Sequence, residues 1–227
     1  MTRGGRPVEQ PTRAERIEGR AGPLTGLVGA LLTGAGLVMS DVAGIDAVNP
    51  DAPAGVVAAA IADHRARLHG GSIVLMVGPF LLVCFLVYLP QRLDPDGDAR
   101  WMAPTASAGG LITVTLMALI VAYVRVAVQT TFEGADAVIP RAIALADWDY
   151  WRTFAPFIAA HMIGAGVVLV RTATPSRVLG WGAITAAALP LVLPPGLMTI
   201  VFLLWLMVLS IALLIRPMST VRSDLPR

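Results

Sequence analysis

The chain contains 227 residues, of which 56% are apolar and only 14% are charged, and its mean hydropathy is +0.72. The high apolar content excludes a disordered chain. Because soluble domains carry about 25% charged residues, the low charge argues against an ordinary soluble domain. The net charge is only +2 and all 17 basic residues are arginines, so lysine-dependent chemistry is excluded and no basic surface for nucleic acid is present. We therefore expect an all-α, polytopic membrane helix bundle embedded in the lipid bilayer.

The first 21 residues form a polar segment with five arginines and three glutamates. A segment of low hydrophobicity and high charge cannot bury a core, which is typical of disorder. We predict a disordered cytoplasmic tail over residues 1–21, a transmembrane domain over 22–216 and a cytoplasmic C-terminal tail over 217–227.

Six apolar segments follow the first tail, and most are close to the roughly 20 residues that a helix needs to cross a bilayer. They cover residues 22–40, 72–90, 105–128, 153–170, 178–193 and 197–215. The last two are separated by Leu193-Pro194-Pro195-Gly196, where a continuous helix is not expected because proline fixes φ and lacks an N–H group. The sequence therefore predicts six transmembrane helices.

The arginines are distributed unevenly between the two sides of these segments. Twelve lie in one set of flanks, whereas the opposite set contains only Arg65, Arg67, Arg141 and Arg152. Arginine-rich flanks stay in the cytoplasm. We therefore expect a bacterial inner (plasma) membrane protein with an even number of crossings and both termini in the cytoplasm.

The two long outer loops each contain a segment that favours a short helix. Residues 53–68 begin with a proline, carry one apolar stripe and are followed by Gly70-Gly71, which is typical of a helix with a glycine stop. Residues 139–147 suit a helix that lies on the membrane surface. We expect the second transmembrane helix to begin after the two glycines.

His161 lies in the fourth segment, about nine residues from Arg152, which places it about 13 Å along the helix and near the membrane midplane. Ionisable groups at this depth are rare and are candidates for functional residues. A neutral histidine can also bond to a carbonyl or hydroxyl of a neighbouring helix, so a packing role and a proton-transfer or ligand-binding role both stay open. The hydroxyl partners we consider are Thr33, Thr113, Thr115, Thr185 and Thr199. A bis-histidine haem would need a second histidine at similar depth. The sequence has none there, so no cofactor is predicted.

Arg125 is the only charged residue within the six predicted segments, and it lies about two turns before Glu133. Its guanidinium could reach the interface by snorkelling. It could instead pair with an outer-loop carboxylate or contact an anionic ligand, because guanidinium binds such groups through two hydrogen bonds. We expect an ion pair and retain the other two roles as alternatives.

Asp63, His64 and His69 are candidate metal ligands at the end of the first outer loop. Ligands on one helical face are spaced three or four residues apart, whereas the two histidines are five apart, so a solvated helix end is the alternative. Cys84 is the only cysteine and lies in an apolar run; it excludes an intramolecular disulfide, and we expect a small buried side chain.

Pairs of small residues spaced four apart occur in three of the segments. Such pairs let two transmembrane helices approach closely, so we expect packing within the chain, with dimerisation as the alternative. The pairs are Gly22 and Gly26, Ala30 and Gly34, Ala160 and Gly164, and Gly182 and Ala186.

The glycine-rich first segment, the alanine-rich stretch from Val56 to Leu68 and the turn Thr174-Pro-Ser-Arg-Val-Leu-Gly-Trp181 resemble features of a bacterial membrane family known as domain of unknown function 4386. The resemblance covers residues 22–215. It implies a six- or seven-helix membrane protein but no activity, and it transfers no functional residue.

The sequence contains no nucleophile elbow, metalloprotease helix, phosphate loop or dinucleotide fingerprint. We therefore expect a non-enzymatic ligand-binding, sensory or partner-binding membrane module, whose protein partner would be another membrane protein or a second copy. One alternative is a small transporter or proton-coupled carrier that uses His161 and Arg125. A second alternative is a membrane enzyme with an outward-facing metal or acid–base site drawn from Asp63, His64, His69, Asp147 and Asp149.

The predicted orientation can be tested with reporter fusions. Fusions after Arg100 and after Arg177 should report the cytoplasm, and fusions within residues 47–60 and 134–146 should report the exterior, because arginine-rich flanks are retained inside. Activities of a paired periplasmic and cytoplasmic reporter measure the side directly. A cytoplasmic result for residues 134–146 would contradict the six-crossing assignment.

Overall fold

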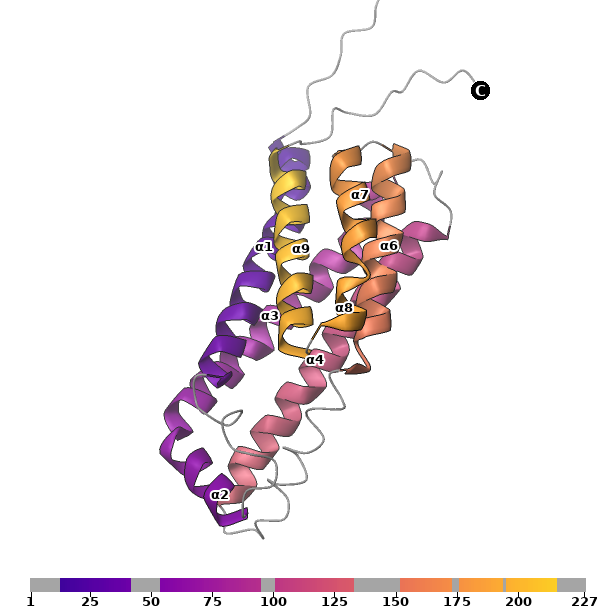
Figure 1. Ribbon diagram of the computed structural model, residues 1–227. Helices are drawn as coiled ribbons and strands as arrows, with labels where there is room; N and C mark the ends of the chain where they lie inside the picture. The colour runs from indigo at the N-terminus through magenta and orange to yellow at the C-terminus, as the bar shows by residue number, and fades with distance from the viewer. Residues whose placement is uncertain are drawn as a thin grey trace, which may run out of the picture.

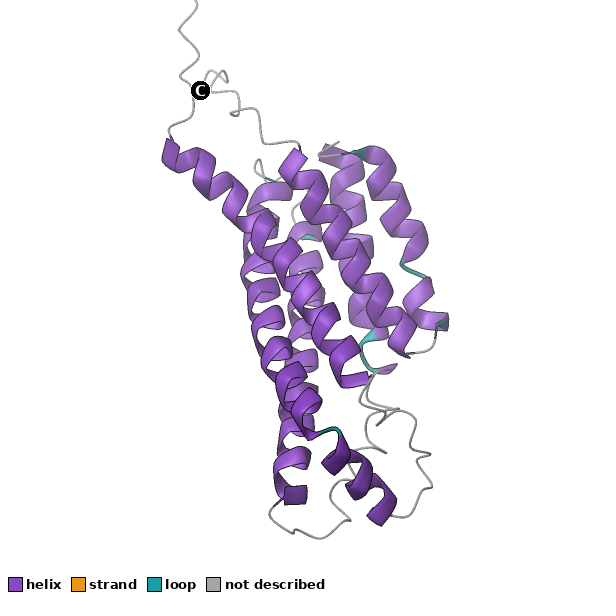
Figure 2. Cartoon of the chain, turned by 90° about the vertical axis from the view of Figure 1, so that its left-hand side faces the viewer, coloured by secondary structure: helices purple, strands orange, loops and turns teal. Residues whose placement is uncertain are grey.

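The computed structural model describes residues 13–41, 54–94, 101–132, 152–172, 176–193 and 195–215. Within these residues every regular element is an α-helix, as Figure 2 shows, and the predicted all-α class is confirmed. In chain order the helices are α1 (Arg13–Asp41), α2 (Ala54–Asp63), α3 (Arg65–Leu93), α4 (Met102–Phe132), α6 (Ala155–Thr172), α7 (Arg177–Ala186), α8 (Leu189–Val192) and α9 (Pro195–Ile215).

The long helices form a bundle in which α1 begins and α9 ends at the same end of the molecule (Figure 1). Helix α1 packs against α3 and α9, α4 packs against both α3 and α6, and α7 packs against α6. Among the described residues, α1, α3, α4, α6 and α9 each contain a segment that is long and apolar enough to cross a membrane. This arrangement confirms a membrane helix bundle.

The remaining apolar segment forms two short helices, α7 and α8, separated by a turn at Ala187 and Ala188. Our expectation of one continuous helix over residues 178–193 is wrong at this turn. Pro190 lies just inside α8, and a proline removes a hydrogen bond and clashes with the carbonyl four residues earlier. The predicted break before α9 is confirmed, because Leu193 is extended at φ −79° and ψ 153° and α9 begins at Pro195.

Two helix starts differ from the predicted ones. Helix α1 begins at Arg13, so residues 13–21 are helical, although we assigned them to a disordered tail. Helix α3 begins at Arg65 and runs through Gly70-Gly71, where we expected a stop. A glycine inside a helix costs only about 0.5–1 kcal/mol relative to alanine, and burial of residues such as Leu68, which is 2% exposed, outweighs that cost.

The short helix predicted over residues 53–68 is confirmed in part: α2 covers Ala54–Asp63, but the chain turns at His64 and residues 65–68 belong to α3. The helix predicted over residues 139–147 lies outside the described residues, as do residues 1–12 and 216–227.

Glycines bring the backbones of α1 and α3 into close contact. A Cβ atom on Gly29 would lie 2.9 Å from the backbone N of Leu82, and a Cβ on Gly78 would lie 2.6 Å from the backbone N of Thr33. These distances are too short for a real side chain, so only glycine allows this helix spacing. The Thr33 hydroxyl is buried here and donates to the Gly29 carbonyl at 2.7 Å.

Helix α4 lies between α3 and α6 and is held by a hydrogen bond as well as by small residues. The Ser107 hydroxyl donates to the Leu86 carbonyl of α3 at 2.6 Å. On the other side, a Cβ on Gly164 of α6 would lie 3.0 Å from the backbone N of Ala106. Buried residues of the three helices, such as Phe85 of α3, belong to one apolar core that also includes Phe202 of α9.

The outer surface of the bundle is apolar, as expected for contact with lipid. Phe80 is 66% exposed and Val178 is 81% exposed. Cys84 also lies on this surface, so our expectation that it is buried is wrong. Among the small pairs, Gly22, Gly26 and Gly164 pack against other helices, whereas a Cβ on Gly182 would meet no atom within 4 Å.

The glycine contacts predict opposite effects for two alanine substitutions. Gly78→Ala should lower the free energy of unfolding by about 1–3 kcal/mol, because the added methyl forces α1 and α3 apart. Gly182→Ala should leave stability unchanged or raise it, since the site is open and alanine is the better helix former. Thermal unfolding of both variants in one detergent measures the difference. Equal stability of Gly78→Ala and the wild type would contradict the close packing.

Candidate functional site

His161 is positioned by α6 in the centre of the bundle and is 0% exposed. Small and branched apolar residues surround it in the helix sequence Ala-Pro-Phe-Ile-Ala-Ala-His-Met-Ile-Gly-Ala-Gly. Such residues favour a membrane helix with few polar atoms. The imidazole is therefore an isolated polar group within an apolar segment.

The Nδ1 atom of His161 lies 2.6 Å from the carbonyl oxygen of Ala106 on α4. Because a carbonyl only accepts hydrogen bonds, this contact requires a proton on Nδ1. Two adjacent glycines of α4 make room for the histidine. A Cβ on Gly110 would lie 2.8 Å from Nδ1, and a Cβ on Gly109 would lie 3.0 Å from the backbone N of His161.

The imidazole also contacts α9. The rings of His161 and Phe202 lie edge to face, with centroids 5.6 Å apart and an interplanar angle of 84°. Atom Nε2 is buried and has no hydrogen-bond partner among the described residues. With the proton on Nδ1, a neutral imidazole presents a lone pair at Nε2, so this atom can accept one hydrogen bond.

The partner found for His161 is a backbone carbonyl, whereas we considered threonine hydroxyls. Thr33, Thr113 and Thr185 donate instead to carbonyls of their own helices. This is the usual local bond of a threonine inside a helix. The sequence signal that marks the real contact is the Gly109-Gly110 pair, which sequence reasoning missed.

Helix α9 contributes further buried polar atoms. Nε1 of Trp205 and Oγ of Ser210 are buried and, like Nε2 of His161, have no hydrogen-bond partner within the described ranges. Phe202, which contacts His161, also lies on α9. Buried polar groups without partners are uncommon in native proteins, so these two atoms make α9 unusual.

Arg125 lies on α4, but far from His161. Ala106, whose carbonyl contacts His161, is the residue of α4 that lies beside His161. Arg125 is 19 residues further along α4, which corresponds to about 28 Å along a helix. Figure 1 shows that the last part of α4 extends past the start of α6 and of α9. The side chain of Arg125 is outside the described part of the structure, so its predicted ion pair stays a prediction.

Asp63, His64 and His69 lie around the junction of α2 and α3. Asp63 ends α2, His64 precedes α3, and His69 is exposed one turn inside α3. Among the described residues, no group of three His, Cys, Asp or Glu side chains could hold a metal ion. The structure therefore does not bring these three residues together as a metal site, and Asp147 and Asp149 lie outside the described residues.

Comparison of the chain with protein-family models, with curated proteins and with solved structures gives no match. The resemblance to domain of unknown function 4386 thus stays an expectation from sequence patterns.

The hydrogen bond to Ala106 predicts the tautomer of His161. We expect the neutral form with the proton on Nδ1 and none on Nε2, because the Ala106 carbonyl needs a donor and a charged imidazole at this depth is costly. Solid-state ¹⁵N NMR of protein with labelled histidine reports both nitrogens, and the spectrum of His161→Gln identifies the signals. A proton on Nε2 would contradict the contact with Ala106.

Proposed function

We propose that this chain is a non-enzymatic membrane module that binds a small, largely apolar ligand inside the helix bundle. Nε2 of His161 is the atom that would accept a hydrogen bond from the ligand. The arginine distribution supports a position in the plasma membrane with both termini in the cytoplasm.

The observation that carries this proposal is the Nε2 atom, to which the described residues supply no hydrogen-bond partner, on a side chain that is 0% exposed. A buried acceptor without a partner costs about 1–3 kcal/mol. The bilayer interior offers no water that could supply the bond from outside the bundle. A ligand with one O–H or N–H group would remove that cost when it binds.

The surroundings of the imidazole indicate what the rest of the ligand is like. Phe202 contacts the ring directly, and Leu86 and His161 both approach Gly110. These neighbours offer apolar surface and no charge, so a charged ligand would lose its hydration without a compensating partner. A small apolar molecule with a single hydrogen-bond donor fits these conditions best.

The two alternatives receive less support. A carrier with one site that contains both His161 and Arg125 would have to bridge about 28 Å of α4, which exceeds the reach of an arginine side chain. An outward-facing enzyme site would need Asp63, His64 and His69 to converge, and they form no metal-binding group among the described residues.

The proposal can be tested with ligands that differ only in the donor. The purified protein in nanodiscs is titrated with decanol and with decyl methyl ether, which keeps the oxygen but lacks the O–H group. Decanol should raise the unfolding temperature more than the ether in the wild type, because only decanol can donate to Nε2.

The matched variants are His161→Leu, which removes the acceptor, and Thr113→Val, which removes a buried hydroxyl that bonds its own helix. Thr113→Val should still distinguish the two ligands, whereas His161→Leu should not. If the wild type responds equally to decanol and to the ether, the proposed role of His161 is wrong.

A further inference from the structure

Two exposed arginines lie at one corner of the bundle, at the end where α1 begins. Arg171 is in the last turn of α6 and Arg177 is the first residue of α7. The two helices are in close contact just below, because a Cβ on Gly180 would lie 2.9 Å from the backbone N of Val170. The close packing therefore places Arg171 and Arg177 at the same end of the α6–α7 pair.

These arginines have no carboxylate nearby along the chain. The whole stretch of residues 153–215 contains no Asp and no Glu. Neither Arg171 nor Arg177 forms an ion pair with any residue that the structure describes. The corner therefore carries two positive charges that an external anion could neutralise.

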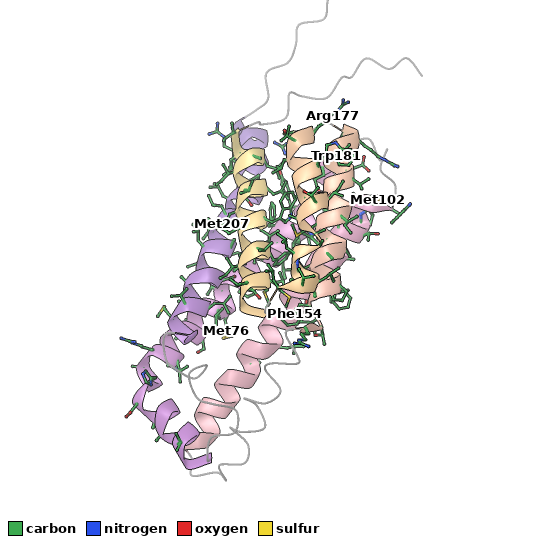
Figure 3. All side chains as sticks on the ribbon, in the orientation of Figure 1. Met76, Met102, Phe154, Arg177, Trp181 and Met207 are labelled. Carbon is green, nitrogen blue, oxygen red and sulfur yellow. The ribbon has the colours of Figure 1, made fainter. Side chains whose placement is uncertain are left out.

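Next to this charge, the outward face of α7 carries apolar and aromatic side chains. Trp181 lies one turn after Arg177 and is 58% exposed, and Val178 beside it is 81% exposed. Figure 3 shows Arg177 and Trp181 at the same end of α7. Gly182 adds no side chain, and a Cβ there would meet no atom within 4 Å, so the backbone of α7 is accessible on this face.

We propose that an anionic phospholipid binds at this corner. Its phosphate is held by Arg171 and Arg177, and its acyl chain lies along Val178, Trp181 and Gly182. Guanidinium forms strong paired hydrogen bonds with phosphate, and tryptophan favours the boundary between headgroup and acyl chain. The charge at the start of α7 is followed within about one turn by the exposed side chains of Val178 and Trp181, just as the charged headgroup of a phospholipid is followed by its acyl chains.

The charge of the corner favours an anionic lipid over a zwitterionic one. A zwitterionic headgroup brings its own cation, which two arginines that pair with no described carboxylate repel. A soluble anion would use the arginines but not the apolar face of α7. The site is independent of His161 and of the direction in which the protein crosses the membrane.

Native mass spectrometry of the full-length protein tests the proposal. The protein is released from mixed micelles that contain phosphatidylglycerol and phosphatidylcholine in equal amounts, and the bound lipids are counted. The wild type should retain phosphatidylglycerol in preference. The double variant Arg171→Gln, Arg177→Gln should lose that preference, with about a fivefold loss of affinity for each arginine.

The matched control is the double variant Arg67→Gln, Arg152→Gln, which removes two exposed arginines from the opposite end of the bundle and should keep the preference. Trp181→Ala should weaken retention of phosphatidylglycerol, whereas Trp101→Ala, which removes another exposed tryptophan, should not.

Two results would overturn the proposal. One is an equal loss of phosphatidylglycerol in both double variants, which would indicate a nonspecific charge effect. The other is displacement of phosphatidylglycerol by inorganic phosphate at millimolar concentration, which would indicate a site for a soluble anion. Thermal unfolding of each variant in phosphatidylcholine alone verifies that the fold is retained.

Discussion

The close approach of helix backbones at glycines is the constraint on which the bundle depends. Helices in a bilayer gain little by burying apolar side chains, because lipid is equally apolar, so association relies on packing and a few hydrogen bonds. Gly29 and Gly78 join α1 to α3, and Gly180 joins α7 to α6, at distances that leave no room for a Cβ atom. These contacts set the helix spacing, and the large side chains of Phe85 and Phe202 fill the space that remains.

The same constraint creates the environment of His161. The Gly109-Gly110 pair lets α4 approach α6 so closely that Nδ1 reaches a backbone carbonyl of α4. Nδ1 then bonds to the protein, whereas no described residue places a donor within hydrogen-bond distance of Nε2. The contact that the two glycines allow therefore determines that Nδ1 carries the proton and that Nε2 is left as a hydrogen-bond acceptor.

The ionisable groups in the second half of the chain lie in two separate places. Residues 153–215 contain no carboxylate, so His161 inside the bundle and the two arginines at its end are the ionisable groups of this stretch. His161 is enclosed, whereas Arg171 and Arg177 are exposed beside Trp181. The interior group suits a small molecule with a hydrogen-bond donor, and the corner suits the headgroup of a lipid.

The sequence by itself determined the class of the protein, because long apolar runs with few charges have no other stable form than membrane helices. It also located the break before α9 from Pro194 and Pro195, and it marked His161 as an unusual residue. Only the tertiary structure decided which residues contact one another. The bond to Ala106, the contact with Phe202 and the distance of Arg125 from His161 depend on how helices cross, and helix crossings are set by contacts between residues far apart in the chain. The same reason explains the wrongly predicted start of α3. Packing stabilises this helix across two glycines at which the local sequence predicts a helix end.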